Sequence, residues 1–233
     1  MRSLIIGRGE IGSSLHKVLQ EKHESYIRDK EPLKKEGIEV LNICYPYSKD
    51  FVKNTKAYIK EYSPKVTIIH STVPPGTTRE IGREVVHSPI HGKHPNLATG
   101  IKTFVKYVGG TQSKAIKTAK DFLLEAGIKA VRVASPETSE LSKVLCTSQY
   151  GWNIVLMKEI YALCKKYKVP FSEVYIQWNT HYNEGYEKLG SPQYKRPILI
   201  YKPGKIGGHC VVNNTKLLKS FITDTIKRKD KTY

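Results

Sequence analysis

The stretch Ser3–Glu21 reads SLIIGRGEIGSSLHKVLQE and predicts a strand, a tight turn and a helix in succession. Its first four residues form a short apolar run, which is typical of a buried parallel strand. Gly7, Gly9 and Gly12 follow at once in the GxGxxG spacing. The segment 13–21 then carries leucine and valine at helical spacing.

The three glycines in this context predict a cradle for the pyrophosphate of a dinucleotide. The first glycine makes the tight turn, the second lets the pyrophosphate approach the backbone, and the third lets the helix pack on the strand. The N-terminus of the helix directs free N–H groups and the positive end of its dipole at the phosphates. We therefore expect a cofactor site formed by Gly7, Gly9, Glu10, Ile11, Gly12, Asp29, Pro46 and Thr72.

Asp29 decides which dinucleotide we expect. It follows a second predicted strand, 25–28, about 20 residues after the glycine turn. An acid at this place can accept hydrogen bonds from both ribose hydroxyls, which favours NAD over NADP. Arg28 and Lys30 flank it and could instead hold a 2′-phosphate. NADP, and a glycine turn without a ligand, remain alternatives.

Strands and helices continue to alternate up to about residue 136. The clearest helices are 49–62 and 113–126, and the further strands are 39–44, 66–70, 85–87, 105–109 and 130–133. This alternation predicts an α/β fold, with a Rossmann-like, doubly wound and mostly parallel sheet. Ligands of such sheets bind at the carboxyl ends of the strands.

The pattern changes at residue 137, where a single helical periodicity extends to about residue 168. A helix of that length spans about 45 Å. We expect an NAD-binding Rossmann domain over 1–136. The second region, 137–233, should hold the long helix, a small helical part and a glycine-rich loop.

The composition is that of a globular protein. The 233 residues include 39 Lys+Arg and 21 Asp+Glu, for a net charge of +18. The lysines are spread along every segment and no nucleic-acid-binding motif accompanies them, so nucleic acid is only a minor alternative partner. No apolar run approaches the ~18 residues of a membrane span, and the N-terminus is not that of a signal peptide. Four scattered cysteines without metal-ligand spacing predict a reduced, cytoplasmic protein that has no metal site.

The loop Lys202–Cys210 reads KPGKIGGHC and places a cysteine among glycines and positive charges. The glycines allow a close approach to a ligand. Lys202, Lys205 and His209 supply positive charge that can stabilise a thiolate. The alternative is a cysteine that serves as a small core hydrophobe, its commonest role.

Four motifs follow the glycine turn in order. They are STVPPGT (71–77), SPIHGKHPN (88–96), ELSKVLCTSQYGWNIVLMKE (140–159) and KIGGHC (205–210). Together with the turn, this order resembles the UDP-glucose/GDP-mannose dehydrogenase family. The GGHC form is most similar to the UDP-N-acetyl-mannosamine/glucosamine dehydrogenase branch. The resemblance implies an NAD-dependent oxidoreductase that acts on CH–OH and oxidises a nucleotide sugar, or a related anionic sugar, to an acid.

The resemblance also implies roles for five residues. Cys210 is the nucleophile that holds the substrate as a thiohemiacetal and then as a thioester, and Lys143 of ELSK stabilises the oxyanion. Thr72 helps to place the attacking water. Thr147 stands where the family has an asparagine that shares oxyanion binding. His94 stands where the family has an acid, and it could act as a base.

Two departures from the family keep another interpretation open. Ile90 replaces a second acid and cannot act as a base. About 23 residues follow Cys210, so the resemblance implies a truncated member that lacks the C-terminal nucleotide-binding domain. The alternative is a non-catalytic NAD-binding or interaction protein derived from that family.

The long helix carries apolar residues on more than one side, including Trp152 and Tyr161. A helix that leaves its sheet needs a second surface to bury such side chains. We therefore expect a homodimer built on this helix, as the resemblance also implies.

Overall fold

The structure, a computed structural model, describes residues 1–92, 95–207 and 210–233. The described chain divides into two compact units, Met1–Val144 and Leu145–Tyr233.

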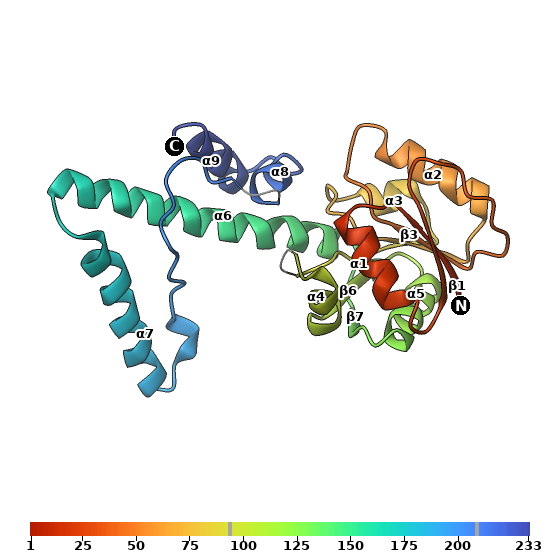
Figure 1. Ribbon diagram of the computed structural model, residues 1–233, viewed down its shortest axis with the longest axis horizontal. Helices are drawn as coiled ribbons and strands as arrows, with labels where there is room; N and C mark the ends of the chain where they lie inside the picture. The colour runs from red at the N-terminus through yellow and green to blue at the C-terminus, as the bar shows by residue number, and fades with distance from the viewer. Residues whose placement is uncertain (93–94, 208–209) are drawn as a thin grey trace. The chain divides into compact units, whose positions relative to one another are not determined.

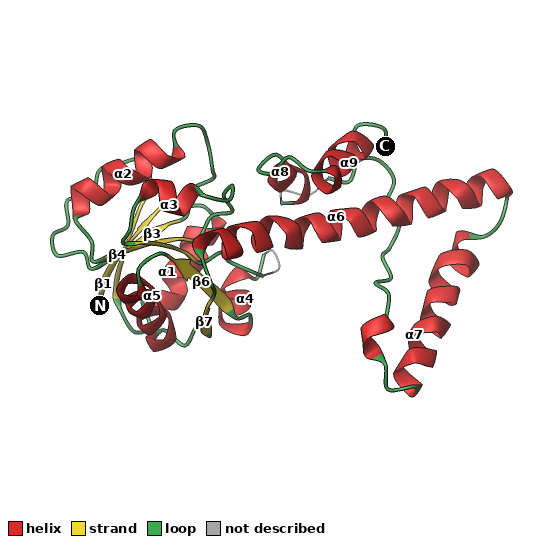
Figure 2. Ribbon diagram, turned by 180° about the vertical axis from the view of Figure 1, so that it is seen from behind, coloured by secondary structure: helices red, strands yellow, loops and turns green. Residues whose placement is uncertain are grey.

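The first unit is built on a seven-stranded sheet (Figures 1 and 2). The strand order is β2-β1-β3-β4-β5-β6-β7, and every neighbouring pair is parallel except β5 and β6. The strands are β1 (Arg2–Ile6), β2 (Glu24–Arg28), β3 (Val40–Ile43), β4 (Val66–Ile69), β5 (Val85–His87), β6 (Lys106–Gly110) and β7 (Ala130–Arg132). The predicted α/β fold with a doubly wound, mostly parallel sheet is confirmed.

Helices cover both faces of the sheet (Figure 2). One buried cluster joins the sheet to α1 (Glu10–Leu19), α4 (Leu97–Thr103) and α5 (Ser113–Glu125). A second cluster joins the opposite face to α2 (Phe51–Tyr62) and α3 (Thr77–Ile81).

Within β1 the two clusters receive alternate side chains. Ile5 enters the first cluster, whereas Leu4 and Ile6 enter the second. Both faces of a strand are therefore buried, which explains why its sequence is a continuous apolar run.

Three local features differ from the sequence-based expectation. Helix α1 begins at Glu10 and not at residue 13, because Gly9 takes the N-cap position and Glu10 places an acid in the first turn. The short helices α3 and α4 were not predicted. Strand β6 runs antiparallel to β5, with Val86 opposite Gly110.

Helix α6 (Pro136–Tyr167) begins in the first unit and continues into the second, and it confirms the long helix predicted from the periodicity. It is followed by a π-helical segment η1 (Ser172–Gln177), α7 (Trp178–Lys188), a 3-10 turn η2 (Pro192–Tyr194), α8 (Val211–Thr215) and α9 (Phe221–Asp230) (Figure 1). Among the described residues, no helix combines the length and the apolar character needed to cross a membrane.

The second unit has a small core of its own. Val155, Val211 and Ile226 are buried together, so α8 and α9 pack on α6. Gly151 makes this packing possible, because a Cβ atom there would lie 2.6 Å from Cγ1 of Val211.

Candidate active site

The turn after β1 lies where the strand order of the sheet reverses. Gly7 has a φ of +106°, and its N–H donates to the Arg28 carbonyl at 2.8 Å. A Cβ atom on Gly7 would lie 3.0 Å from the backbone N of Tyr45 and 3.1 Å from the carbonyl carbon of Cys44, the residues that follow β3. The loops after β1 and β3 therefore meet at the switch point, the place where doubly wound sheets bind ligands.

The space around the Cα atom is filled at Gly12 and open at Gly9. A Cβ atom on Gly12 would lie 1.9 Å from the Gly7 carbonyl oxygen, so only glycine lets α1 pack on the turn. A Cβ atom on Gly9 would meet nothing within 4 Å, so open space lies beside this backbone. Gly9 is the N-cap of α1 and supplies no side-chain cap. This arrangement fits a dinucleotide pyrophosphate, which needs a close backbone approach at a helix N-terminus.

Asp29 is exposed directly after β2. Its neighbour Arg28 is turned toward α2, where its Nη1 donates to Glu61 Oε1 at 2.6 Å and to the Tyr62 hydroxyl at 2.5 Å. The Arg28 guanidinium also lies 5.1 Å from the ring centroid of Tyr58. Arg28 is thus occupied within the protein, whereas Asp29 and its other neighbour Lys30 are exposed, and Asp29 can face a ribose.

The remaining predicted cofactor residues also lie in the first unit. Glu10 is exposed in the first turn of α1, and Ile11 packs against the adjoining core cluster. Pro46 is exposed after β3, and Thr72 is half-buried after β4. Thr72 follows Ser71, whose hydroxyl donates to the Tyr45 carbonyl at 2.6 Å.

Lys106 is a buried lysine that sequence reasoning missed. It is 1% exposed, and its Nζ donates to the carbonyls of Ser88 at 2.5 Å and Pro89 at 3.1 Å. Burial lowers its pKa to about 7, an effect that the Cys44 thiol opposes and the Lys143 charge increases. The only sequence signal is a charged residue at the start of an otherwise apolar strand.

Two buried histidines lie at the carboxyl ends of neighbouring strands: His87 is the last residue of β5, and His70 directly follows β4. His87 contacts Ser139 Oγ through Nδ1 at 2.8 Å and the Ser71 carbonyl through Nε2 at 3.1 Å. Its pKa falls to about 3, mainly because the ring is buried. Burial also holds the pKa of His70 well below its ordinary value, and its Nε2 contacts Asn42 Oδ1 at 2.9 Å. Both rings are therefore neutral near pH 7 and act as hydrogen-bonding groups.

Lys143 lies on the part of α6 that belongs to the first unit. Its Nζ donates to the Ile90 carbonyl at 2.8 Å. Together with Lys106, it therefore supplies ammonium donors to three successive carbonyls, 88–90, after β5. His91 comes next, and burial, Lys143 and Lys106 lower its pKa to about 4.

Glu140 anchors the start of α6 to the STVPPGT segment. It is fully buried and accepts from the backbone N–H groups of Gly76 at 2.6 Å and Thr78 at 2.8 Å. The Thr78 hydroxyl also donates to it at 2.6 Å. Burial raises the pKa of Glu140, while these donors favour the carboxylate. This anchor, also missed from sequence, ties two of the motifs together within the first unit.

Cys210 and Thr147 lie in the second unit. Cys210 is exposed and takes the N-cap position of α8. Thr147 on α6 accepts from Asn214 Nδ2 of α8 at 3.3 Å. The structure thus brings Thr147 to the short helix whose N-cap is Cys210. His94, the predicted base, lies outside the described residues.

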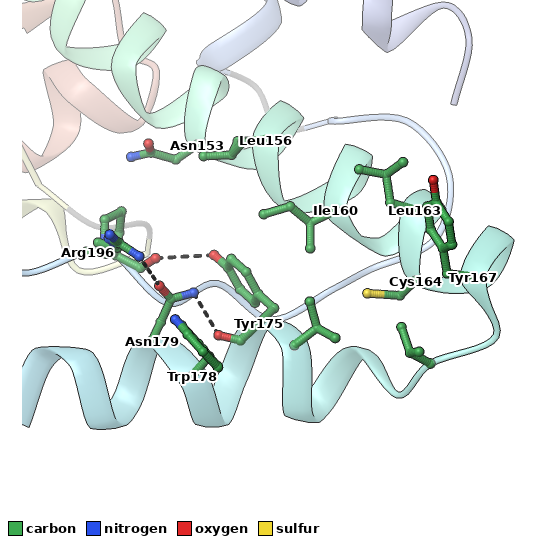
Figure 3. A pocket seen from close by; sticks show the side chains of 13 residues that line it. Asn153, Leu156, Ile160, Leu163, Cys164, Tyr167, Tyr175, Trp178, Asn179 and Arg196 are labelled. Carbon is green, nitrogen blue, oxygen red and sulfur yellow. Dashed lines mark hydrogen bonds between the residues drawn. The ribbon is translucent and has the colours of Figure 1, made fainter.

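The second unit also contains an apolar groove of about 720 Å³ between α6 and the segment 169–197 (Figure 3). Leu156, Ile160 and Leu163 line it from α6. On the other side, Asn179 donates to the Tyr175 carbonyl at 2.7 Å and accepts from Arg196 at 3.4 Å.

No cluster of three or more His, Cys, Asp or Glu side chains suited to a metal ion occurs in the described ranges.

No protein-family model matches the chain. In sequence it is similar to Protein CapL of Staphylococcus aureus, at 24% identity over 80% of this chain and 46% of that protein. It is also similar to the UDP-N-acetyl-D-mannosamine dehydrogenase of Pyrococcus horikoshii, at 26% identity over 66% of this chain and 37% of that protein. The chain thus spans less than half the length of these curated relatives.

A solved structure of the UDP-D-ManNAc dehydrogenase from Pyrococcus horikoshii shares the fold. It superposes with a TM-score of 0.80 at 19% identity, over 99% of this chain and 68% of that one. The sequence matches confirm the resemblance predicted from the motifs.

Proposed function

We propose that the chain is an NAD-dependent oxidoreductase of the nucleotide-sugar dehydrogenase kind, which oxidises a sugar CH–OH group to an acid. The observation that carries the proposal is the open space at Gly9, in front of the α1 N-terminus and at the switch point of the sheet. The similarity to UDP-N-acetyl-D-mannosamine dehydrogenases supports the substrate class.

The residues of the first unit would hold the cofactor in the following way. The turn from Gly7 to Gly12, with Glu10 and Ile11, would receive the pyrophosphate, and Asp29 would accept from the ribose hydroxyls. Pro46 and Thr72 would border the site from the loops after β3 and β4. Two NAD⁺ molecules, bound there one after the other, would each supply the acceptor for one of the two hydrides that the substrate carbon loses between alcohol and acid.

Cys210 supplies the nucleophile. Its thiolate forms a C–S bond to the carbon of the intermediate aldehyde, which gives a thiohemiacetal and, after oxidation, a thioester. Water then adds to the thioester carbon, the C–S bond breaks, and the acid and the thiol are released. Thr72 holds this water.

Lys143 stabilises the negative charge that develops on the substrate oxygen. Its position is set by the bond to the Ile90 carbonyl. The Thr147 hydroxyl donates to the same substrate oxygen, at the position where the resembling family has the amide of an asparagine. We keep His94 as the proposed base that takes the proton of the attacking water.

The test measures NADH formation, through its absorbance, with UDP-N-acetyl-mannosamine, UDP-glucose and GDP-mannose as substrates. Cys210→Ala should abolish acid formation, and Cys210→Ser should leave a trace. Lys143→Ala should reduce turnover by about 10²–10³-fold, the scale of one lost oxyanion donor. Cys146→Ala, at another exposed cysteine, is the matched control and should keep wild-type activity. No NADH with any of these substrates would reject the proposed reaction.

Cofactor choice is tested separately by calorimetry. We expect tighter binding of NAD(H) than of NADP(H), because Asp29 repels a 2′-phosphate and Arg28 is held by Glu61 and Tyr62. Asp29→Ser should reduce this preference. Equal or tighter binding of NADP(H) to the wild type would contradict the role of Asp29.

Ile90 favours a second candidate function, a non-catalytic NAD-binding protein. This residue stands where the resembling family has an acid, and it is 6% exposed within the apolar core. NAD(H) binding without turnover of any tested sugar would select this candidate over the enzyme.

A further inference from the structure

Lys158 on α6 is a buried charge that the proposed chemistry does not use. It is 5% exposed. Its Nζ donates to the Lys202 carbonyl and to the Gly204 carbonyl, both at 2.6 Å. Both carbonyls belong to the KPGKIGGHC loop that leads to Cys210.

The surroundings of the Lys158 ammonium compensate for its loss of water. The ammonium lies 5.1 Å from the ring centroid of Tyr201 and 5.0 Å from that of Tyr233. Burial lowers the pKa of Lys158, and the Asp230 carboxylate opposes this effect. A buried ammonium is costly unless it is hydrogen-bonded. The two carbonyl contacts are therefore strongly preferred over any arrangement of the loop that lacks them.

Asp230, at the end of α9, holds the same loop through a different backbone group. Its Oδ1 accepts from the Ile206 N–H at 2.8 Å. The two side chains thus bind every second residue from 202 to 206, with the carbonyls of 202 and 204 on Lys158 and the amide of 206 on Asp230. Gly204 has a φ of +78°, a left-handed conformation that favours glycine and that these contacts hold in place.

The helix that follows the loop is packed in place as well. Cys210 is the N-cap of α8, and the next residue, Val211, is buried against Val155 and Ile226. Cys210 therefore lies between a loop bound by Lys158 and Asp230 and a helix that is packed on α6.

We propose that Lys158 and Asp230 are positioning residues that hold the loop 202–207 and thereby determine where the Cys210 thiol is presented. The proposal rests on the proposed function for the importance of Cys210. It assigns no contact of Lys158 or Asp230 with a substrate or cofactor.

The first experiment measures amide hydrogen exchange by NMR in the full chain. Lys158→Met keeps an unbranched side chain, one atom shorter, and removes the ammonium that donates both hydrogen bonds. It should raise the exchange rate of the Ile206 amide at least tenfold, although the direct partner of that amide is Asp230. Lys166→Met removes the same charge from an exposed site on the same helix and should leave the rate unchanged. An Ile206 amide that stays as protected in Lys158→Met as in the wild type would overturn the proposal.

The second experiment tests whether the contacts of Lys158 and Asp230 with the loop affect the reactivity of the Cys210 thiol. Cys210 and Cys146 are both exposed, so the ratio of their alkylation rates by iodoacetamide reports Cys210 with an internal reference. We expect Lys158→Met and Asp230→Ala each to change this ratio at least threefold. Lys158→Arg keeps a cation with hydrogen-bond donors and should bring the ratio back close to the wild-type value. Lys166→Met should not change the ratio. A ratio that is the same in all variants would show that Lys158 and Asp230 do not position Cys210.

Neither measurement depends on turnover. A wild-type chain that forms no NADH would reject the proposed reaction and leave the exchange and alkylation results interpretable. Unchanged exchange and alkylation in an active enzyme would reject the positioning role alone.

Discussion

At Gly9 and Gly12 the addition of a side chain should have opposite consequences. Gly12→Ala places a Cβ atom 1.9 Å from the Gly7 carbonyl oxygen, and such overpacking should destabilise the protein by about 2 kcal/mol or more. Gly9→Asn places its side chain in open space and keeps a good N-cap residue. It should therefore unfold at the wild-type temperature while its affinity for NADH falls at least tenfold. Thermal unfolding and calorimetry of both variants check this.

The contrast between the two variants is the critical result. Wild-type NADH affinity in Gly9→Asn would show that no pyrophosphate approaches this backbone. A loss of stability in Gly9→Asn equal to that in Gly12→Ala would show that the space is not open.

Lys106 should make stability depend on pH in an unusual direction. In the unfolded chain its pKa is near 10.5, and in the folded protein it is about 7. Between these values the unfolded chain binds more protons, so stability rises with pH. The rise attributable to Lys106 between pH 7 and pH 9 is about 2 kcal/mol.

Urea denaturation followed by far-UV circular dichroism at the two pH values measures this effect. Lys106→Met should lose the rise relative to the wild type. Lys114→Met removes a charge from an exposed position on α5 and should keep it. An equal pH dependence in wild type and Lys106→Met would contradict the assignment.

At the scale of elements, Glu140 links the start of α6 to the start of α3. Glu140→Ala leaves the N–H groups of Gly76 and Thr78 without their acceptor and should cost about 3 kcal/mol. Glu140→Gln keeps one acceptor oxygen and should cost less. The matched control is Glu137→Gln on the same helix, because Glu137 pairs with exposed Arg79 and such pairs contribute at most about 1 kcal/mol. Chemical denaturation ranks the three variants, and equal losses for Glu140→Ala and Glu137→Gln would contradict the anchor.

The elements that could be predicted are those whose signal is local. The β1–turn–α1 order follows from an apolar run, three glycines and helical spacing, and α6 follows from an uninterrupted periodicity. The direction of β6 could not be predicted, because the apolar residues of a strand repeat in the same way in both directions. Helices α3 and α4, five and seven residues long, are too short to show a period.

Site residues, too, could be predicted only where their signal is local in the sequence. A glycine spacing or a loop cysteine can be read from the chain itself. The buried groups Lys106, His87 and Glu140 can be recognised only once the fold brings partners to them from distant segments, 16 to 64 residues away. In the sequence, Lys106 and Glu140 look like ordinary surface charges.

At the scale of the whole molecule, we expect a homodimer in solution. Leu156 and Leu163 on α6 are 55% and 52% exposed, and Trp178 on α7 is 69% exposed. These residues line the groove of Figure 3, an apolar surface that a second copy can bury. Light scattering at micromolar concentration should give twice the mass of the 26.5 kDa chain.

The double variant Leu156→Glu/Trp178→Glu should shift the mass to that of the monomer, because charges would enter the buried surface. Leu124→Glu changes a leucine of α5 that is 50% exposed and should leave the dimer intact. A monomeric wild type, or a double variant that remains dimeric, would contradict the expected assembly.

The reversed direction of β6 determines which parts of the candidate site can be altered without moving Lys106. In a parallel sheet, the edge that faces ligands receives its side chains from loops, whose lengths and shapes vary easily. Because β6 runs the other way, its first residue, Lys106, reaches that edge while its backbone is still fixed in the sheet. The loop after β4 can therefore be replaced or lengthened, by evolution or by design, while the Lys106 side chain keeps its place. The loop after β5 must keep the Ser88 and Pro89 carbonyls, because they hold the Lys106 Nζ. A variant with a grafted loop after β4 would keep Lys106 as a fixed polar group beside the new loop, and a new specificity could be built around it.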